Sequence, residues 1–211
     1  LTESDVMVDS PTNNFATFNS LGWQWSKVSA TMSQGNLRCW DNATDWTHAN
    51  GTIIIPKDKK VYYEVYGVDD KSYAGIALVE ANSNAYGAGS RPDGFIKGMV
   101  SCYLDTNTAA IVFRRKVDGT ALGNQAFSGT GFFNSILGVA IDQGNADVDE
   151  RIKFYINGSL VASGLNPAGC IDTTSDYIPI IAGYGTGRQV VNFGQDSSFA
   201  GIKTEQGNQD A

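Results

Sequence analysis

Histidine, serine and carboxylate side chains could support catalysis in this chain, and their spacing argues against it. A serine nucleophile needs a base and an orienting acid, yet the chain has one histidine, His48, and no Gly-x-Ser-x-Gly motif. His48 lies in a segment, WTHANG, that we predict to be a turn. Retaining glycoside hydrolysis needs two carboxyl groups about 5–5.5 Å apart, and the strand pattern Glu-x-Asp-x-x-Glu is absent. We therefore predict that the protein is not an enzyme.

Acidic and amide side chains gather in one short stretch that could hold a cation. Oxygen ligands at short spacing suit Ca²⁺, and four such residues occur here: Asp142, Asn145, Asp147 and Asp149. They do not match an EF-hand loop, because the required glycine and the glutamate at its twelfth position are missing. A solvated loop between two strands is our main interpretation, a calcium or lattice site is the weaker one, and no other cofactor is predicted.

Aromatic and arginine side chains in glycine-rich or polar loops are the better candidates for a binding site. Such residues dominate binding hot spots, and long loops carry function in β-sandwiches. The alternative for the tryptophans is burial in the core. Residues 183–187 (GYGTG) are not a phosphate loop, since a strand follows them where a helix would be needed. The predicted ligand-binding residues are Tyr86, Arg91, Asp93, Tyr184, Arg188, Trp40 and Trp46.

The elements that must position these loops are strands. Apolar residues alternate with polar ones in 61–66 (VYYEVY), 136–142 (ILGVAID) and 151–156 (RIKFYI), as in half-buried antiparallel strands. Asn157-Gly158 follows directly, and Asn-Gly between apolar runs is the strongest short hairpin signal. Asp118-Gly119 predicts a second turn. We find no sustained helical periodicity, so we predict an all-β domain of two packed antiparallel sheets.

Composition excludes several classes of protein. The net charge of −7 argues against nucleic-acid binding, and the chain has no apolar run of about 18 residues that would cross a membrane. Three widely spaced cysteines, Cys39, Cys102 and Cys170, allow at most one disulfide and include no Cys-x-x-Cys pair. Small buried residues are the plainer interpretation of these cysteines. Their oxidation state stays open at this point.

Four stretches, in order, resemble a SPRY domain. Residues 60–65 (KVYYEV), 73–78 (YAGIAL), 136–158 (ILGVAID followed by IKFYING) and 177–199 are similar to the strands that define this family. The resemblance implies a bent sandwich of concanavalin-like layout and a non-catalytic binding module. Residues 8–19 (VDSPTNNFATFN) and 199–208 (FAGIKTEQGN) depart from the animal pattern and resemble segments of tailed-phage structural proteins.

These resemblances lead to the expected organisation and function. We expect lead-in strands over 1–57 packed on the sandwich, a SPRY-like sandwich over 58–200, and a linker or tail of a longer chain over 201–211. The expected role is a virion surface protein, on a tail fibre or capsid, that recognises a host surface glycan or a neighbouring virion protein. The alternatives are a cellular SPRY adaptor that binds a peptide and, less favoured, a glycan-active enzyme using Asp147 or Asp149. The sequence leaves the oligomeric state open, and a homo-oligomer is one of the alternatives.

Overall fold

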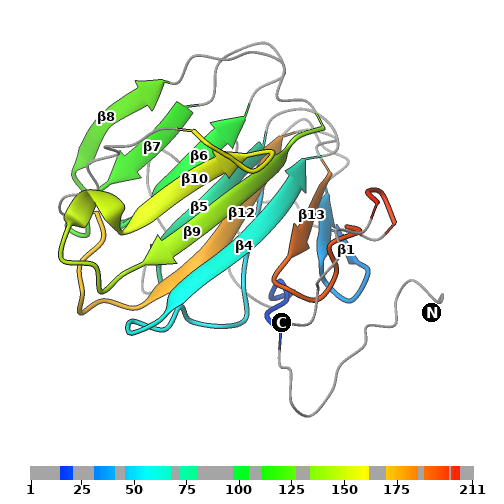
Figure 1. The fold of residues 1–211 in the computed structure, drawn as a ribbon, viewed down its shortest axis with the longest axis horizontal. Helices are drawn as coiled ribbons and strands as arrows, with labels where there is room; N and C mark the ends of the chain where they lie inside the picture. Colours follow the sequence, from blue (N-terminus) through cyan, green and yellow to red (C-terminus); the bar gives the residue numbers. More distant parts are fainter. Residues whose placement is uncertain are drawn as a thin grey trace.

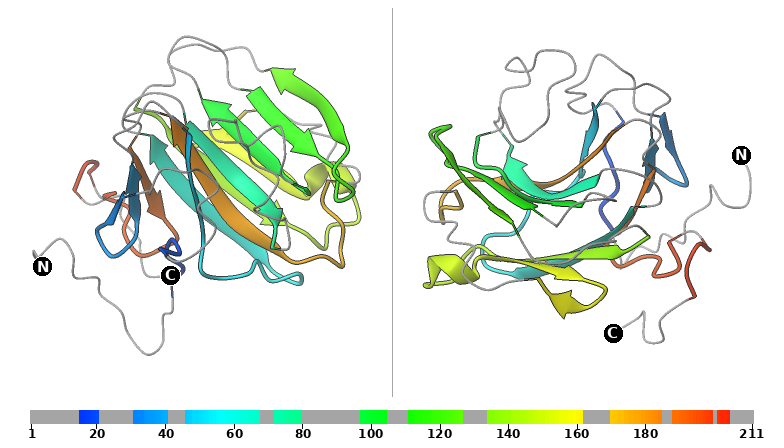
Figure 2. Two further views of the ribbon diagram at one scale, coloured as in Figure 1. Left: turned by 180° about the vertical axis from the view of Figure 1, so that it is seen from behind. Right: turned by 90° about the horizontal axis from the view of Figure 1, so that it is seen from above.

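The computed structural model shows an all-β protein of two antiparallel sheets packed face to face (Figure 1). It describes residues 15–20, 31–40, 46–67, 72–79, 97–104, 111–126, 134–161, 170–184, 188–199 and 201–204. The strand order is β1-β2-β13-β4-β9-β10-β11 in one sheet and β3-β12-β5-β6-β7-β8 in the other. Figure 2 shows the two layers from behind and from above. The predicted two-sheet sandwich is confirmed.

The seven-stranded sheet is built from segments at both ends and the middle of the chain. Its strands are β1 (Thr31–Ser33), β2 (Arg38–Trp40), β13 (Gln189–Asn192), β4 (Lys60–Gly67), β9 (Ile136–Asp142), β10 (Ile152–Ile156) and β11 (Ser159–Leu160). The six-stranded sheet contains β3 (Trp46–Asn50), β12 (Tyr177–Tyr184), β5 (Ser72–Leu78), β6 (Val100–Leu104), β7 (Ile111–Arg115) and β8 (Ala121–Ala126). A short 3-10 helix, η4 (Val148–Glu150), precedes β10.

Alternating burial along the strands places the core between the sheets, as the sequence predicts. In β4, Tyr63 and Val65 are buried while Tyr62 is exposed. In β9, Leu137, Val139 and Ile141 all belong to the main buried cluster. Since successive side chains of a strand point to opposite faces, the residues between them lie on the outer face of the seven-stranded sheet.

Both predicted turns are present. Asn157 and Gly158 have φ values of 49° and 78°, as a two-residue hairpin turn requires at both central positions. Gly119 has φ 92°, and the Lys116 amide donates to the Thr120 carbonyl at 2.9 Å to close the second turn between β7 and β8. The turn predicted around His48 is wrong, because this residue lies within β3 and is opposite Ala182 of β12. Pairing with β12 overrides the polar composition of this short segment.

Polar contacts tie the two layers and their ends together. The Tyr63 hydroxyl of β4 crosses the core and donates to the Gly75 carbonyl of β5 at 2.5 Å. The Asn192 side chain accepts from the amides of Gly194 at 2.8 Å and Asp196 at 3.1 Å, as expected of a strand-end amide beside a glycine. Cys39, Cys102 and Cys170 are all buried, and none of the three forms a disulfide.

The described part of residues 1–57 supplies edge strands of both sheets. β1 and β2 continue the seven-stranded sheet beyond β13, while β3 pairs with β12 at the edge of the other sheet. Phe18 is fully buried and forms an isolated bridge with Gly51. Within the described residues, no helix is long and apolar enough to cross a membrane.

Candidate functional site

Four of the seven predicted ligand-binding residues lie at strand ends on one end of the sandwich. Trp40 ends β2 and Trp46 begins β3, while Tyr184 ends β12 and is opposite Trp46 in the sheet. Arg188 is exposed and directly precedes β13. Because Gln189 is opposite Cys39 in antiparallel register, Arg188 and Trp40 lie at the same end of their sheet.

The other three predicted residues, Tyr86, Arg91 and Asp93, lie outside the described residues. The structure therefore shows a shared location for four candidates without describing how the three aromatic side chains among them contact one another. A binding role for all seven residues stays a prediction.

The side chains of the acidic stretch, the weaker candidate for a calcium site, make hydrogen bonds within the stretch itself. The Asn145 amide group donates to Asp142 Oδ2 at 3.2 Å, and Asn145 Oδ1 accepts from the Asp147 amide at 3.0 Å. Asp147 in turn caps η4 by accepting from the Asp149 amide at 3.0 Å. Among the described residues, no group of three or more His, Cys, Asp and Glu side chains could hold a metal ion. Asn145 and Asp147 therefore stabilise consecutive turns by accepting backbone N–H groups.

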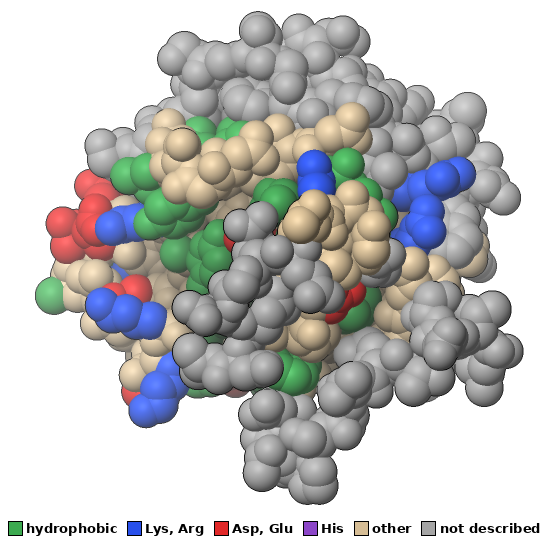
Figure 3. All heavy atoms as spheres, turned by 45° about the vertical axis from the view of Figure 1, so that its right-hand side comes forward, with side chains coloured by type: hydrophobic (Ala, Val, Ile, Leu, Met, Phe, Trp, Pro, Cys, Tyr) green, Lys and Arg blue, Asp and Glu red, His purple; other side chains and the backbone are tan. Residues whose placement is uncertain are grey.

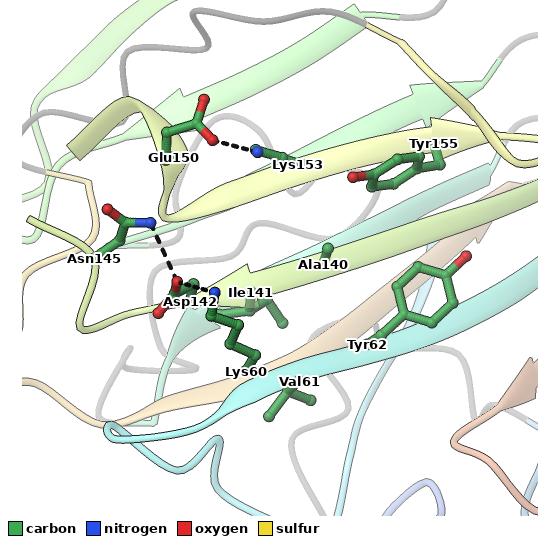
Figure 4. Close-up of a pocket in the computed structure, with 10 residues that line it drawn as sticks. All are labelled: Lys60, Val61, Tyr62, Ala140, Ile141, Asp142, Asn145, Glu150, Lys153 and Tyr155. Carbon is green, nitrogen blue, oxygen red and sulfur yellow. Dashed lines mark hydrogen bonds and ion pairs between the residues drawn. The ribbon is translucent and has the colours of Figure 1, made fainter. Parts of the chain in front are cut away.

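A groove lies on the outer face of the seven-stranded sheet (Figure 4). It has a volume of about 320 Å³ and follows β9, with β4 on one side and β10 on the other. Its lining residues are Lys60, Val61, Tyr62, Ala140, Ile141, Asp142, Asn145, Glu150, Lys153 and Tyr155. The outward residues of β9 explain the hollow, because small side chains on a central strand leave space between larger neighbours.

Strand register sets which side chains face each other across this groove. Gly138 of β9 is opposite Glu64 of β4 and Tyr155 of β10. Ala140 is opposite Tyr62 on one side and Lys153 on the other. Directly opposed residues of antiparallel strands point to the same face. The outer face therefore carries a low central row between two rows of long side chains.

Tyr62 lies across the floor of the groove. A Cβ atom at Gly138 would lie 2.3 Å from the Tyr62 hydroxyl oxygen, so the glycine is what leaves room for the ring. The hydroxyl donates to Glu64 Oε1 at 2.9 Å, and the ring meets Tyr155 edge-on with centroids 6.3 Å apart. Partial burial and the hydrogen bond to Glu64 raise the pKa of Tyr62, so the hydroxyl stays protonated near neutral pH. The ring is thus held in place, with 49% of the residue exposed.

Charged side chains in opposite-sign pairs occupy the other end of the groove. Lys60 lies 3.5 Å from Asp142 Oδ2, and Lys153 forms an ion pair with Glu150. The contact with Glu150 raises the pKa of Lys153. Lys60 is largely exposed, so these pairs add little to stability. They place ammonium donors and carboxylate acceptors side by side at the groove end.

A second, apolar hollow of about 210 Å³ adjoins the first through Val61 and Tyr62. Its lining includes Ile53 and Ile54, both more than two-fifths exposed. On the face drawn in Figure 3, hydrophobic side chains lie next to charged ones. Leu160, also exposed, is opposite Tyr155 in the β10–β11 pair and so faces the same side.

Sequence reasoning did not find this groove. The alternation in 61–66 and 136–142 already placed Tyr62 and Gly138 on outward faces, and that signal was available. The sequence did not reveal the strand register that places Tyr155 of β10 opposite Gly138, so the groove between the two tyrosines was not predicted.

Comparison with known proteins establishes the fold. No family model matches the chain, and no curated protein matches its sequence. Among solved structures, the chain is similar to the TRIM65 PSpry domain, with a TM-score of 0.54 and 11% identity over 85% of this chain and 90% of that chain. It is also similar to stonustoxin, with a TM-score of 0.53 and 12% identity over 84% of this chain and 28% of that chain. The chain therefore has a SPRY-like fold.

Proposed function

We propose that this chain is a non-catalytic binding module on the surface of a tailed-phage virion, where it recognises a host surface glycan or a neighbouring virion protein. The carrying observation is the open groove across β4, β9 and β10, continuous with exposed Ile53 and Ile54. The SPRY-like fold supports a binding role, because such domains are generally binding modules. The resemblance of residues 8–19 and 199–208 to phage structural proteins supports the virion setting.

Direct binding tests this proposal. We would label the folded domain with a fluorophore and incubate it with a panel of bacterial strains and with their extracted surface polysaccharides. Saturable binding to one strain that its own polysaccharide competes would support glycan recognition. Heat-unfolded protein at the same labelling ratio controls for non-specific binding through core side chains that unfolding exposes. Failure to bind any strain, together with absence of the polypeptide from purified virions by mass spectrometry, would contradict the proposal.

A cellular adaptor that binds a peptide is the second candidate function. Its support is the similarity to the TRIM65 PSpry domain over nearly the whole of that domain. Flanking RING, coiled-coil or ankyrin segments in the parent gene would favour the adaptor, and fibre or capsid segments would favour the virion protein. Selection from a displayed peptide library separates the two. One enriched peptide bound at micromolar affinity, with no labelling of bacterial cells, would favour the adaptor.

A further inference from the structure

The groove combines an aromatic corner with a polar end. Gly138 lets the Tyr62 ring lie against β9, and in Figure 4 this ring is seen nearly face-on over the sheet. Tyr155 meets it with an interplanar angle of 78° and forms a wall. One face of a fixed, half-exposed ring is therefore open to a ligand. An aromatic face of this kind offers apolar contact area at a low cost in side-chain entropy.

The polar end lies one short step along the same groove. Ala140 and Asp142 are two residues apart in β9, which corresponds to about 7 Å along a strand. There the Lys60–Asp142 and Lys153–Glu150 pairs offer donors and acceptors whose charges cancel pairwise. A ligand with a full charge would meet an opposite and a like charge together. Hydroxyl groups, which both donate and accept, match such a mixed lining better.

Backbone hydrogen bonding excludes strand addition onto β4 and β9, the two central strands of the groove. β4 is paired with β13 and β9, and β9 is paired with β4 and β10. A polypeptide that binds by β-augmentation needs a free strand edge, and these two central strands have none. Nucleic acid is disfavoured by the net charge of −7. The volume of about 320 Å³ is at the small end of ligand sites, which span about 300–1,000 Å³.

We propose that the groove over β4, β9 and β10 is a binding site for a neutral saccharide, with one sugar ring on Tyr62 against Tyr155 and hydroxyl groups on the Asp142, Glu150 and Lys153 side chains. This inference rests on the part of the proposed function that names a glycan as the ligand. It places the glycan site on the sheet face instead of the loop end that holds Trp40 and Arg188. Because the charges are paired, affinity depends weakly on ionic strength.

Nuclear magnetic resonance of the ¹⁵N-labelled chain tests the site directly. The probes are cellotetraose, chitotetraose and maltotetraose, together with any surface polysaccharide that competes for binding of the fluorescent domain to bacterial cells. For at least one probe we expect saturable chemical-shift changes confined to β4, β9 and β10. Raising the salt concentration should change the dissociation constant by less than about twofold. Tyr62→Ala should weaken that binding by about tenfold or more, while Tyr62→Phe keeps the ring and most of the affinity. If none of these saccharides shifts the resonances of the groove residues, the inference is wrong.

Two further variants separate this inference from the proposed function. Gly138→Ala drives the Tyr62 ring off the floor while leaving both tyrosines in the chain, and it should weaken binding as Tyr62→Ala does. Arg188→Ala lies at the loop end and should leave saccharide binding unchanged. If Arg188→Ala abolishes binding and Gly138→Ala does not, the glycan function stands and the groove inference is wrong. Shifts in the groove caused by a selected peptide and by no saccharide would also overturn it.

Discussion

Tyr62 and Tyr63 are chain neighbours in β4 that face opposite sides of the sheet. Tyr63 is buried, and its hydroxyl reaches the Gly75 carbonyl of the other sheet. We expect Tyr63→Phe to lower the free energy of unfolding by about 1–2 kcal/mol, because a buried carbonyl loses its donor. Urea unfolding followed by tryptophan fluorescence measures this change.

Tyr62→Phe is the matched control for that change. It removes the same atom from a half-exposed side chain whose acceptor, Glu64, water can also satisfy. Its expected effect is within about 0.5 kcal/mol. Equal losses for the two variants would show that the bond across the core contributes no more than a surface one.

His48 makes folding sensitive to mild acid. Burial lowers its pKa to about 3 in the folded protein, against about 6.5 in an unfolded chain. Between these values the unfolded state binds a proton that the folded state does not, so the free energy of unfolding falls as the pH falls. The full contribution is present above pH about 6.5, and roughly 2 kcal/mol is lost by pH 5.

Urea unfolding at several pH values between about 7 and 5 checks this prediction. The chain has one histidine, the side-chain type whose ordinary pKa lies in this window, so His48 should dominate the change over the small contribution of the carboxylates near pH 5. His48→Gln should flatten the profile there, whatever its effect on stability at pH 7. A wild-type profile that is already flat from pH 7 to pH 5 would contradict a buried neutral histidine.

At the scale of elements, the Asn157-Gly158 turn joins three strands. Asn157 Oδ1 accepts from the Ile136 amide at 2.9 Å, and its amide group donates to Ser135 Oγ at 3.1 Å. The side chain thereby fixes the start of β9 to the end of β10. Asn157→Ala loses both bonds and places alanine at a positive φ, so we expect a loss of about 1–2 kcal/mol. Faster amide hydrogen exchange in β10 and β11 would locate the effect.

Gly158→Asn offers the control for that turn. Nothing lies within 4 Å of a Cβ atom built on Gly158, and asparagine tolerates its positive φ. The exchange rates of β10 should then stay close to those of the wild type. If both variants accelerate exchange equally, turn conformation is responsible and the Asn157 side-chain bonds are not.

Elements were predictable from the sequence where local physics is strong. Alternation over five or more residues predicted β4, β9 and β10, and Asn-Gly predicted the hairpin between β10 and β11. The three-residue strands β1 and β2 carry too little periodicity to be seen. The groove was not predictable, because it depends on register between segments about 75 residues apart in the chain, such as Tyr62 and Ala140. In the acidic stretch, by contrast, the contacts are local: Asn145 and Asp147 each accept the backbone amide two residues further along the chain.

At the scale of the whole molecule, the three cysteines are distributed so that their reactivity reports on opening of the sandwich. Cys39 lies in β2 at one side of the seven-stranded sheet, Cys102 in β6 of the other sheet, and Cys170 before β12. All three are buried. Burial raises the pKa of the Cys102 thiol and raises that of Cys170 to about 11. Since only the thiolate attacks a disulfide reagent, the folded protein should react slowly.

We expect no fast reaction with Ellman's reagent at pH 8 in the absence of denaturant, and three thiols per chain in urea. Slow reaction of Cys102 should follow global unfolding, because it lies between two paired strands of the six-stranded sheet. Cys39 should react soonest, because β2 is short and only β1 lies outside it in the described sheet. Cys39→Ala should then remove the earliest phase and leave the slow ones unchanged. A count below three thiols per chain in urea, without reducing agent, would instead reveal a disulfide and contradict the reduced state of these buried side chains.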